Sequence, residues 1–250
     1  SFYLIAGLAE TSAVDLFTFV HSAKERAECD IGPLASLCRS VDVTLLEHGA
    51  GAMRPLATLA SNMPRSVRFF QDSQSVMEIR RKLMRVYDLV ICDEIAVSPY
   101  MWDVPGLERT PRLVIRHKID HQHYAEVAAR RGLGQDKALD WVEARRLRRF
   151  EEAEMPRFQG VVVCSEDDRQ VAALQLAGNG APVEVIVNGA DTSFFQPVRT
   201  PDTHPTALIM GTMHYYPNID GALHYVQTMH EALRAAIPDL QILIVGHTPP

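Results

Sequence analysis

The sequence has 250 residues, of which 47% are hydrophobic and 22% are charged, so it can bury a sizeable core and is not expected to be disordered. Its formal net charge of −6 excludes the basic footprint that nucleic-acid-binding proteins usually carry. The four cysteines fit no metal-binding spacing, and no apolar run approaches the roughly 18 residues of a membrane span. We therefore expect a soluble, cytoplasmic protein that binds no nucleic acid.

The first half of the chain is expected to alternate helices and strands. Buried-strand patterns occur at 14–20, 41–46, 88–92 and 112–115, and helical periodicity occurs at 53–63 and 73–86. Such alternation predicts an α/β fold with a parallel sheet. Residues 2–8 resemble the middle of a helix, so the natural chain is expected to begin upstream, with the first strand missing.

A long amphipathic helix is predicted at 137–158. Its opposite face is heavily charged and includes the cluster Arg145-Arg146-x-Arg148-Arg149, which is either simply solvated or attracted to an anionic membrane surface. Three glutamates at 151, 152 and 154 follow directly and offset the positive charge, which favours the solvated face. The apolar stripe of the helix consists of Leu139, Val142, Ala144, Leu147 and Phe150.

The second half continues the alternation and then changes character. Strands are predicted at 161–164 and 183–187, with a helix that begins at Ser165 between them. Prolines at 197, 201 and 205 interrupt a polar stretch that is typical of a linker. A strand at 207–210, a helix to Ala236 and a strand at 241–245 follow. The sequence thus predicts two domains, at 1–200 and 201–250, with the boundary between Phe195 and Thr206.

Several motifs occur together, in a fixed order, between Gly160 and Gly246. They are Val163-Cys-Ser-Glu166, Val187-Asn-Gly-Ala-Asp191 with Phe194-Phe195, Met210-Gly-Thr-Met213 with Pro217-Asn218, and Pro238-Asp-Leu with the strand that ends at Gly246. In this order and spacing the stretch resembles the domain junction of family 4 glycosyltransferases, close to the bacterial exopolysaccharide sugar transferases. The resemblance implies a GT-B fold, in which a Rossmann-like acceptor domain with a parallel sheet is followed by the first βαβ unit of a Rossmann-like donor domain.

The resemblance also implies a function. It indicates a retaining glycosyltransferase that moves a sugar from a nucleotide diphosphate donor to a glycan or lipid-linked acceptor, in polysaccharide or cell-envelope biosynthesis. Such an enzyme would work in the cytoplasm or in peripheral contact with the inner face of the membrane, with no cofactor besides the donor substrate. Two alternatives stay open: a sugar-nucleotide epimerase of similar fold, and a non-catalytic GT-B-like binding protein. The family's Glu-x7-Glu pair would lie beyond Pro250, so the chain is expected to be truncated at this end as well, and inactive alone.

Polar residues follow three of the predicted strands, at the edge where ligands bind in open α/β sheets. By resemblance, His117 corresponds to a histidine near the transferred sugar and is the candidate catalytic residue, whereas its neighbours are candidate substrate ligands. A zinc hypothesis for His117, His121 and His123 fails because Lys118 stands where a metalloprotease has Glu, and no metal is expected. The candidate substrate ligands are Glu94 after the strand at 88–92, Arg116, Lys118 and Asp120 around His117, and Ser165 after the strand at 161–164.

A second set of candidates lies in the predicted second domain. Gly211 and Thr212 follow its first strand, where a glycine lets backbone N–H groups approach a diphosphate. We expect them, with His214 and Asn218 in the following loop, to bind the nucleotide-sugar donor. Structural alternatives stay open: Gly211-Thr212 as an ordinary turn, and Pro217-Asn218 as the cap of a helix that starts near Ile219.

Overall fold

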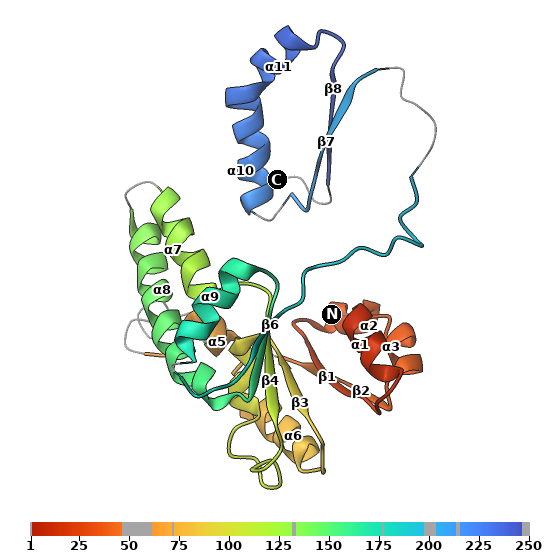
Figure 1. The fold of residues 1–250 in the computed structure, drawn as a ribbon, viewed down its shortest axis with the longest axis vertical. Coiled ribbons are helices and arrows are strands. Elements are labelled where there is room, and N and C mark those ends of the chain that lie inside the picture. Colours follow the sequence, from red (N-terminus) through yellow and green to blue (C-terminus); the bar gives the residue numbers. More distant parts are fainter. Residues whose placement is uncertain are drawn as a thin grey trace. The chain divides into compact units, whose positions relative to one another are not determined.

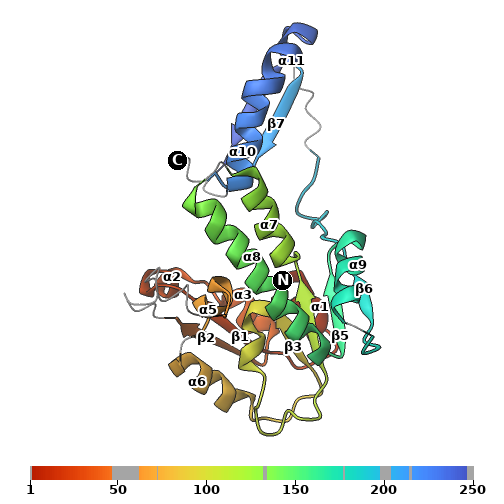
Figure 2. The ribbon, with the colours of Figure 1, turned by 90° about the vertical axis from the view of Figure 1, so that its left-hand side faces the viewer.

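The computed structural model of the chain describes residues 2–46, 62–71, 73–131, 134–176, 178–197, 204–213 and 216–246. The chain forms two compact units, Ser1–Gly189 and Ala190–Pro250 (Figures 1 and 2). The boundary that the sequence predicts, between residues 200 and 201, lies eleven residues further along the chain. Each unit is mixed α/β and contains parallel strands, as the alternating sequence pattern predicts.

The described residues of the first unit form two parallel sheets. Strand β1 (Asp15–Val20) pairs with β2 (Ser40–Leu45), and a four-stranded sheet has the order β3-β4-β5-β6. These strands lie close to their predicted bounds, because runs of Val, Ile and Leu favour a strand that is covered on both faces. The strands of the larger sheet are β3 (Val90–Asp93), β4 (Arg112–Arg116), β5 (Gly160–Val163) and β6 (Val183–Val185).

Helices connect the strands of the first unit, and α7 lies against α8 as a helical hairpin (Figure 2). The helices at α1, α6, α8 and α9 agree with the predicted ones, whereas α2, α5 and α7 have no predicted counterpart. The helix predicted at 53–63 lies almost entirely outside the described residues. The helices are α1 (Phe2–Ala9), α2 (Ala23–Glu28), α3 (Gly32–Leu37), α5 (Arg65–Phe69), α6 (Ser73–Leu83), α7 (Asp120–Arg130), α8 (Gln135–Glu154) and α9 (Glu166–Gln175), with 3₁₀ turns η1 (Ile95–Tyr100) and η2 (Met155–Arg157).

One apolar cluster forms the core of the first unit. Buried side chains of β3, β4 and β5 pack in it with residues of α6, η1 and the segment that follows η1. Within this cluster Trp102 and Phe158 pack with ring centroids 5.2 Å apart, and the Arg157 guanidinium lies 3.9 Å from the Trp102 ring. Because such a cluster excludes water, it fixes the larger sheet against α8 and η2.

Helix α8 buries acidic side chains, where the sequence predicts an apolar stripe and a solvated charged face. Ala144 and Leu147 of the predicted stripe are buried, but Val142 is 38% exposed. The buried face is completed by acidic residues at helical spacing, so the predicted solvation was wrong for Glu151 and Glu154. The acidic residues of this face are Asp140, Glu143, Glu151 and Glu154.

Hydrogen bonds from distant parts of the chain satisfy the three buried glutamates of this helix. The Glu143 carboxylate accepts bonds of 3.0 Å from the backbone N–H groups of both Arg65 and Ser66, at the start of α5. The Glu154 carboxylate accepts bonds from the Ser98 hydroxyl and the Trp102 indole. A buried carboxylate is tolerated when such donors replace its lost water, so these bonds hold α8 to α5 and η1.

Strand β1 begins at a carboxylate with several donors. The Asp15 carboxylate, 1% exposed, accepts bonds from Arg39 Nε at 2.9 Å, Ser40 Oγ at 2.7 Å and the Tyr87 hydroxyl at 3.1 Å. The Arg39 hydrogen bond, aided by those of Ser40 and Tyr87, outweighs the effect of burial and holds the Asp15 pKa well below its ordinary value. The ionised form of Asp15 therefore stabilises the folded chain.

The stability contributed by Asp15 is expected to disappear in acid. A carboxyl group with a lowered folded pKa stabilises fully above its unfolded pKa of about 3.9, and this contribution is lost as the pH falls through the folded value. Asp15→Asn should therefore have a lower free energy of unfolding than the parent chain at pH 7. The difference between the two chains should decrease steadily below about pH 4. Urea unfolding of both chains over this range measures the difference. The control is Asp136→Asn, because the Asp136 side chain is 79% exposed. If the difference in unfolding free energy from the parent chain changes with pH equally for both variants, Asp15 does not have the lowered pKa described above.

The second unit holds one βαβ arrangement. Strand β7 (Thr206–Met210) pairs in parallel with β8 (Gln241–Val245). Between them run α10 (Tyr216–His224), a π-helical turn (Tyr225–Met229) and α11 (His230–Ala236). A Cβ atom at Gly246 would lie 2.0 Å from the Gly211 carbonyl oxygen, so the end of β8 requires a glycine to approach the end of β7.

Candidate functional site

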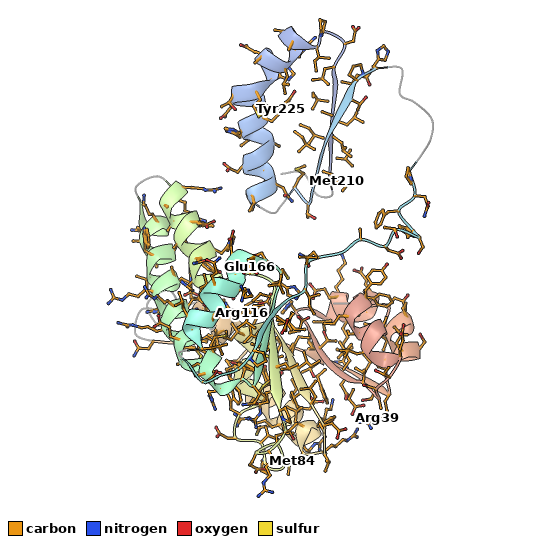
Figure 3. All side chains as sticks on the ribbon, in the orientation of Figure 1. Arg39, Met84, Arg116, Glu166, Met210 and Tyr225 are labelled. Atoms are coloured by element: carbon orange, nitrogen blue, oxygen red, sulfur yellow. The ribbon has the colours of Figure 1, made fainter. Side chains whose placement is uncertain are left out.

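Three strands of the larger sheet end side by side. In the parallel register, Asp93 is paired with Ile115 and Arg116 with Val163, so the residues that follow β3, β4 and β5 meet at one edge. Figure 3 labels Arg116, the last residue of β4, and Glu166, the first residue of α9. Ligands of open α/β sheets bind at this edge, which makes it the candidate site.

His117 is the centre of a chain of polar contacts at this edge. Its Nε2 lies 2.8 Å from Asp93 Oδ1, and its Nδ1 lies 3.9 Å from the Cys164 sulfur. The Cys164 thiol in turn donates to Asn188 Oδ1 at 3.7 Å. The side chains of His117 and Asp93 are 40% and 44% exposed, so a ligand can reach this pair. The Asp93 carboxylate fixes the orientation of the imidazole, which is how histidines are held for binding or proton transfer.

Cys164 does not have the properties of a nucleophile. Burial raises the pKa of its thiol above the ordinary value, and the charges of Asp168, Glu94 and Asp93 raise it further. A thiol in such surroundings stays protonated near neutral pH, whereas the thiolate is the reactive form. The thiol is therefore a hydrogen-bonding neighbour of His117, between β5 and the segment after β6.

Glu94 adds backbone strain to the site. Its φ angle is 86°, a left-handed conformation that is uncommon for any residue except glycine, and its N–H donates to the Ile115 carbonyl at 3.1 Å. Burial raises the pKa of the Glu94 carboxyl, and the Asp120 charge adds to this, while His117, Arg116 and Lys118 oppose it. Such strain costs about 1–3 kcal/mol and is concentrated at functional sites, which supports Glu94 as a member of this one.

Arg116, which the sequence predicts as a substrate ligand, has a different role in the structure. Its side chain is 0% exposed, and its Nη2 lies 3.0 Å from Glu151 Oε1 and 3.7 Å from Asp120 Oδ2. Its Nη1 donates to Gln175 Oε1 at 3.2 Å. Because the guanidinium is enclosed between β4, α8 and α9, it holds these elements together and does not present itself to a substrate. The prediction of substrate contact was therefore wrong for Arg116.

Glu151 shares this buried network with His121. Its carboxylate accepts a 3.0 Å bond from the His121 backbone N–H and lies 2.7 Å from His121 Nδ1. Burial opposes the ionisation of Glu151, but the His121 bond and the charge of Arg116 outweigh it, so the pKa of Glu151 lies below its ordinary value. His121 therefore fixes α7 to α8. Its partner is Glu151, whereas the partner of His117 is Asp93.

The other predicted ligands of the first unit take part in local contacts. Lys118, 47% exposed, lies 3.5 Å from the Asp120 carboxylate. Burial raises the pKa of Asp120, and the charges of Arg116 and Lys118 oppose this increase. The Ser165 hydroxyl accepts from the Asp168 N–H at 3.1 Å and donates to the Asp168 carboxylate at 2.7 Å, which caps α9. Lys118 remains accessible to a ligand, while the Ser165 hydroxyl is engaged by the helix that it caps.

The predicted donor-binding residues lie at the end of β7. Asn218 Nδ2 donates to the Thr212 carbonyl at 3.0 Å, and a Cβ atom at Gly211 would lie 2.5 Å from the same nitrogen. Helix α10 begins at Tyr216, so Asn218 lies in its first turn and does not cap a helix that starts at 219. The glycine thus permits a close contact between this loop and α10. His214 lies outside the described residues.

Two further properties concern the part of the chain that the structure describes. It contains no group of three or more His, Cys, Asp or Glu side chains arranged to hold a metal ion. None of its helices is both long enough and apolar enough to cross a membrane.

The sequence patterns indicate His117 and Glu94 as site residues, whereas Asp93, Cys164 and Asn188, which continue the polar contacts of His117, are not among the predicted ligands. Each of the three follows or ends a strand of the larger sheet, and this position is the signal by which they could have been found. No protein-family model and no curated protein matches the sequence.

Proposed function

We propose that the chain belongs to a retaining glycosyltransferase of the GT-B type, which transfers a sugar from a nucleotide diphosphate donor to a glycan or lipid-linked acceptor. The observation that carries the proposal is the His117–Asp93 pair, which lies exposed at the carboxyl edge of a parallel sheet. The motifs between Gly160 and Gly246, which resemble those of family 4 glycosyltransferases, support it. The α/β architecture with parallel strands in both units is compatible with it.

In the proposed reaction, His117 binds a hydroxyl group of the transferred sugar while Asp93 holds the imidazole in place. Glu94 and Lys118 supply further polar contacts at the same edge. In the second unit, the proposal assigns the donor diphosphate to Gly211 and Thr212, since backbone N–H groups near a helix start attract anions. Stabilisation of the charge that develops on a departing diphosphate is the largest contribution in many such reactions.

His117→Ala is expected to lower turnover at least about tenfold in the natural full-length protein, because it removes a contact to the reacting sugar. The thermal midpoint should stay within a few degrees, since the side chain is 40% exposed. Donor consumption with a panel of uridine, guanosine and adenosine diphosphate sugars and a glycan acceptor measures turnover. His123→Ala is the control, because His123 lies on α7 and outside the contacts of His117 with Asp93 and Cys164.

Product analysis in the same assay separates the proposal from the two alternatives. A transferase forms an acceptor-linked sugar, an epimerase alters the donor sugar without an acceptor, and a binding protein leaves the donor unchanged. If His117→Ala is unstable but its activity per folded molecule is unaltered, His117 is not a catalytic residue. The product analysis then still decides the class of reaction.

A further inference from the structure

A cavity of about 410 Å³ lies at the edge of the larger sheet that is opposite to the candidate site. Its lining comes from the segment between η1 and β4, from the first residue of β4 and from η2. Arg112 lines the cavity and begins β4, whereas His117 follows the last residue of this strand. The two residues are therefore roughly 16 Å apart along the strand, and the cavity is separate from the contacts of His117.

Two arginines of the cavity lie over the ring of Trp102. The guanidinium carbon of Arg157 is 3.9 Å from the centre of the ring, and that of Arg112 is 5.0 Å from it. The ring is held in the core, since Trp102 is 5% exposed and its indole N–H donates to the Glu154 carboxylate. Because an aromatic ring attracts cations to its face, Trp102 keeps both guanidinium groups at the cavity.

The charge of Arg112 is not neutralised by the residues that the structure describes. Its Nη2 donates to a backbone carbonyl, but its Nε is buried without a hydrogen-bond partner, and Arg112 has no ion pair within the described ranges. Arg157, in contrast, lies 2.9 Å from Glu154 Oε1. Burial lowers the pKa of Arg112, and the charge of Arg157 lowers it further. A bound carboxylate would stabilise this cation, because the planar guanidinium matches carboxylate geometry.

Two exposed carboxylates line the same cavity. Their charges oppose the decrease in the Arg112 pKa, so Asp103 and Glu108 lie close enough to Arg112 to act on it. The Glu108 carboxylate accepts a 2.9 Å bond from the Gly106 N–H, whereas that of Asp103 forms no hydrogen bond with the described residues. The carboxylates would repel a ligand that is only anionic, and the arginines would repel one that is only cationic. The lining therefore favours a ligand that carries both charges.

We propose that this cavity is a second binding site, which takes a free α-amino acid with its carboxylate at the two arginines and its ammonium group at Asp103 and Glu108. An α-amino acid is the simplest small molecule with both groups, and the cavity volume is within the usual range of ligand sites. The apolar surface of Val104 and Pro105 favours an apolar side chain in the ligand. The proposal does not rest on the proposed sugar transfer, and its test contains no sugar donor.

The test is a titration of the 250-residue chain with each common amino acid, followed by the NMR signals of the indole N–H groups. The chain has two tryptophans, and Trp141→Phe assigns their signals. Trp102 lines the cavity, whereas Trp141 lies on α8, is 49% exposed and is the internal control. At least one amino acid should shift the Trp102 signal to saturation with a Kd of about 1 mM or below, and the Trp141 signal should stay unchanged.

Two derivatives of the amino acid that binds separate a zwitterion site from a site for one charge. The N-acetyl derivative keeps the carboxylate and loses the ammonium group, and the amide does the reverse. Each should bind at least about tenfold more weakly than the parent amino acid, because each loses a charge-assisted contact. If either derivative or inorganic phosphate binds as tightly as the amino acid, the cavity recognises a single charge and the proposal is wrong.

Variants at the cavity connect the binding to its residues. Arg112→Gln and Asp103→Asn should each weaken binding at least about tenfold. Asp103→Asn keeps the test valid if Arg112→Gln does not fold, because Asp103 is exposed and its φ of 57° is one that Asn also adopts. The matched control is Arg109→Gln, an exposed residue of the same segment that does not line the cavity, and it should leave binding unchanged. Unaltered binding by Asp103→Asn, or no shift of the Trp102 signal with any amino acid, would overturn the proposal.

Discussion

Arg116→Met is expected to lower the free energy of unfolding by about 3–5 kcal/mol, because it leaves the buried carboxylate of Glu151 without its cationic partner. Both side chains are 0% exposed and lie 3.0 Å apart, so water cannot replace the lost contact. The variant also removes the bond to Gln175 and one of the cationic partners of Asp120, which keeps its contact with Lys118. Urea unfolding of the variant and the parent chain at pH 7 measures the difference.

The matched control is Arg148→Met, which removes an arginine from an ion pair at the surface. Arg148 is 67% exposed and lies 2.8 Å from Glu152 on the same helix. Exposed pairs of this kind contribute about 0–1 kcal/mol, because solvent screens them. If the two variants lose similar stability, Arg116 is not the buried partner of Glu151 that the structure indicates.

Phe158→Ala is expected to lower the free energy of unfolding by a similar amount, about 3–5 kcal/mol, because it removes a buried apolar side chain. The Phe158 ring is 1% exposed and packs against Trp102, which is itself 5% exposed. Truncation removes this packing and leaves a cavity that the surrounding β5 and η2 cannot fill without moving. The thermal midpoint and the urea midpoint should both fall, with little change in the dependence on urea concentration.

Leu174→Ala on α9 is the control for the loss of apolar volume. Its side chain is 81% exposed, so the change should stay within about 0.5 kcal/mol. A loss of stability for Phe158→Ala as small as this would contradict the burial of Phe158 in the core against Trp102.

The candidate site could be predicted from the sequence only in part. His117 and Glu94 follow apolar runs that form β4 and β3, and the end of a parallel strand is a general location for ligands. Arg116 lies beside them in the sequence, but as the last residue of β4 its side chain points to the side of the sheet covered by α8 and α9. Neighbouring strand residues face opposite ways, so adjacency in the chain did not imply a shared role.

Helix α7 shows why some elements were not predicted. Its sequence from Asp120 to Arg130 has one fully buried residue, Ala128, and few large apolar side chains. Its place is fixed by contacts with α8, including those of His121 with Glu151. An apolar stripe is the main signal of a helix in a single sequence, and a helix that packs through polar contacts lacks it.

The sequence by itself determined the strands of this protein, the alternation of strands with helices and the mixed α/β class. These follow from local properties, since runs of Val, Ile and Leu favour buried strands. Only the tertiary structure decided which charges are buried. Glu143 caps a helix 78 residues earlier in the chain, and Glu151 receives bonds from His121 and Gln175, 30 and 24 residues away. A charged residue on a helix has the same local pattern whether water or a distant donor satisfies it, and the folded chain alone brings that donor near.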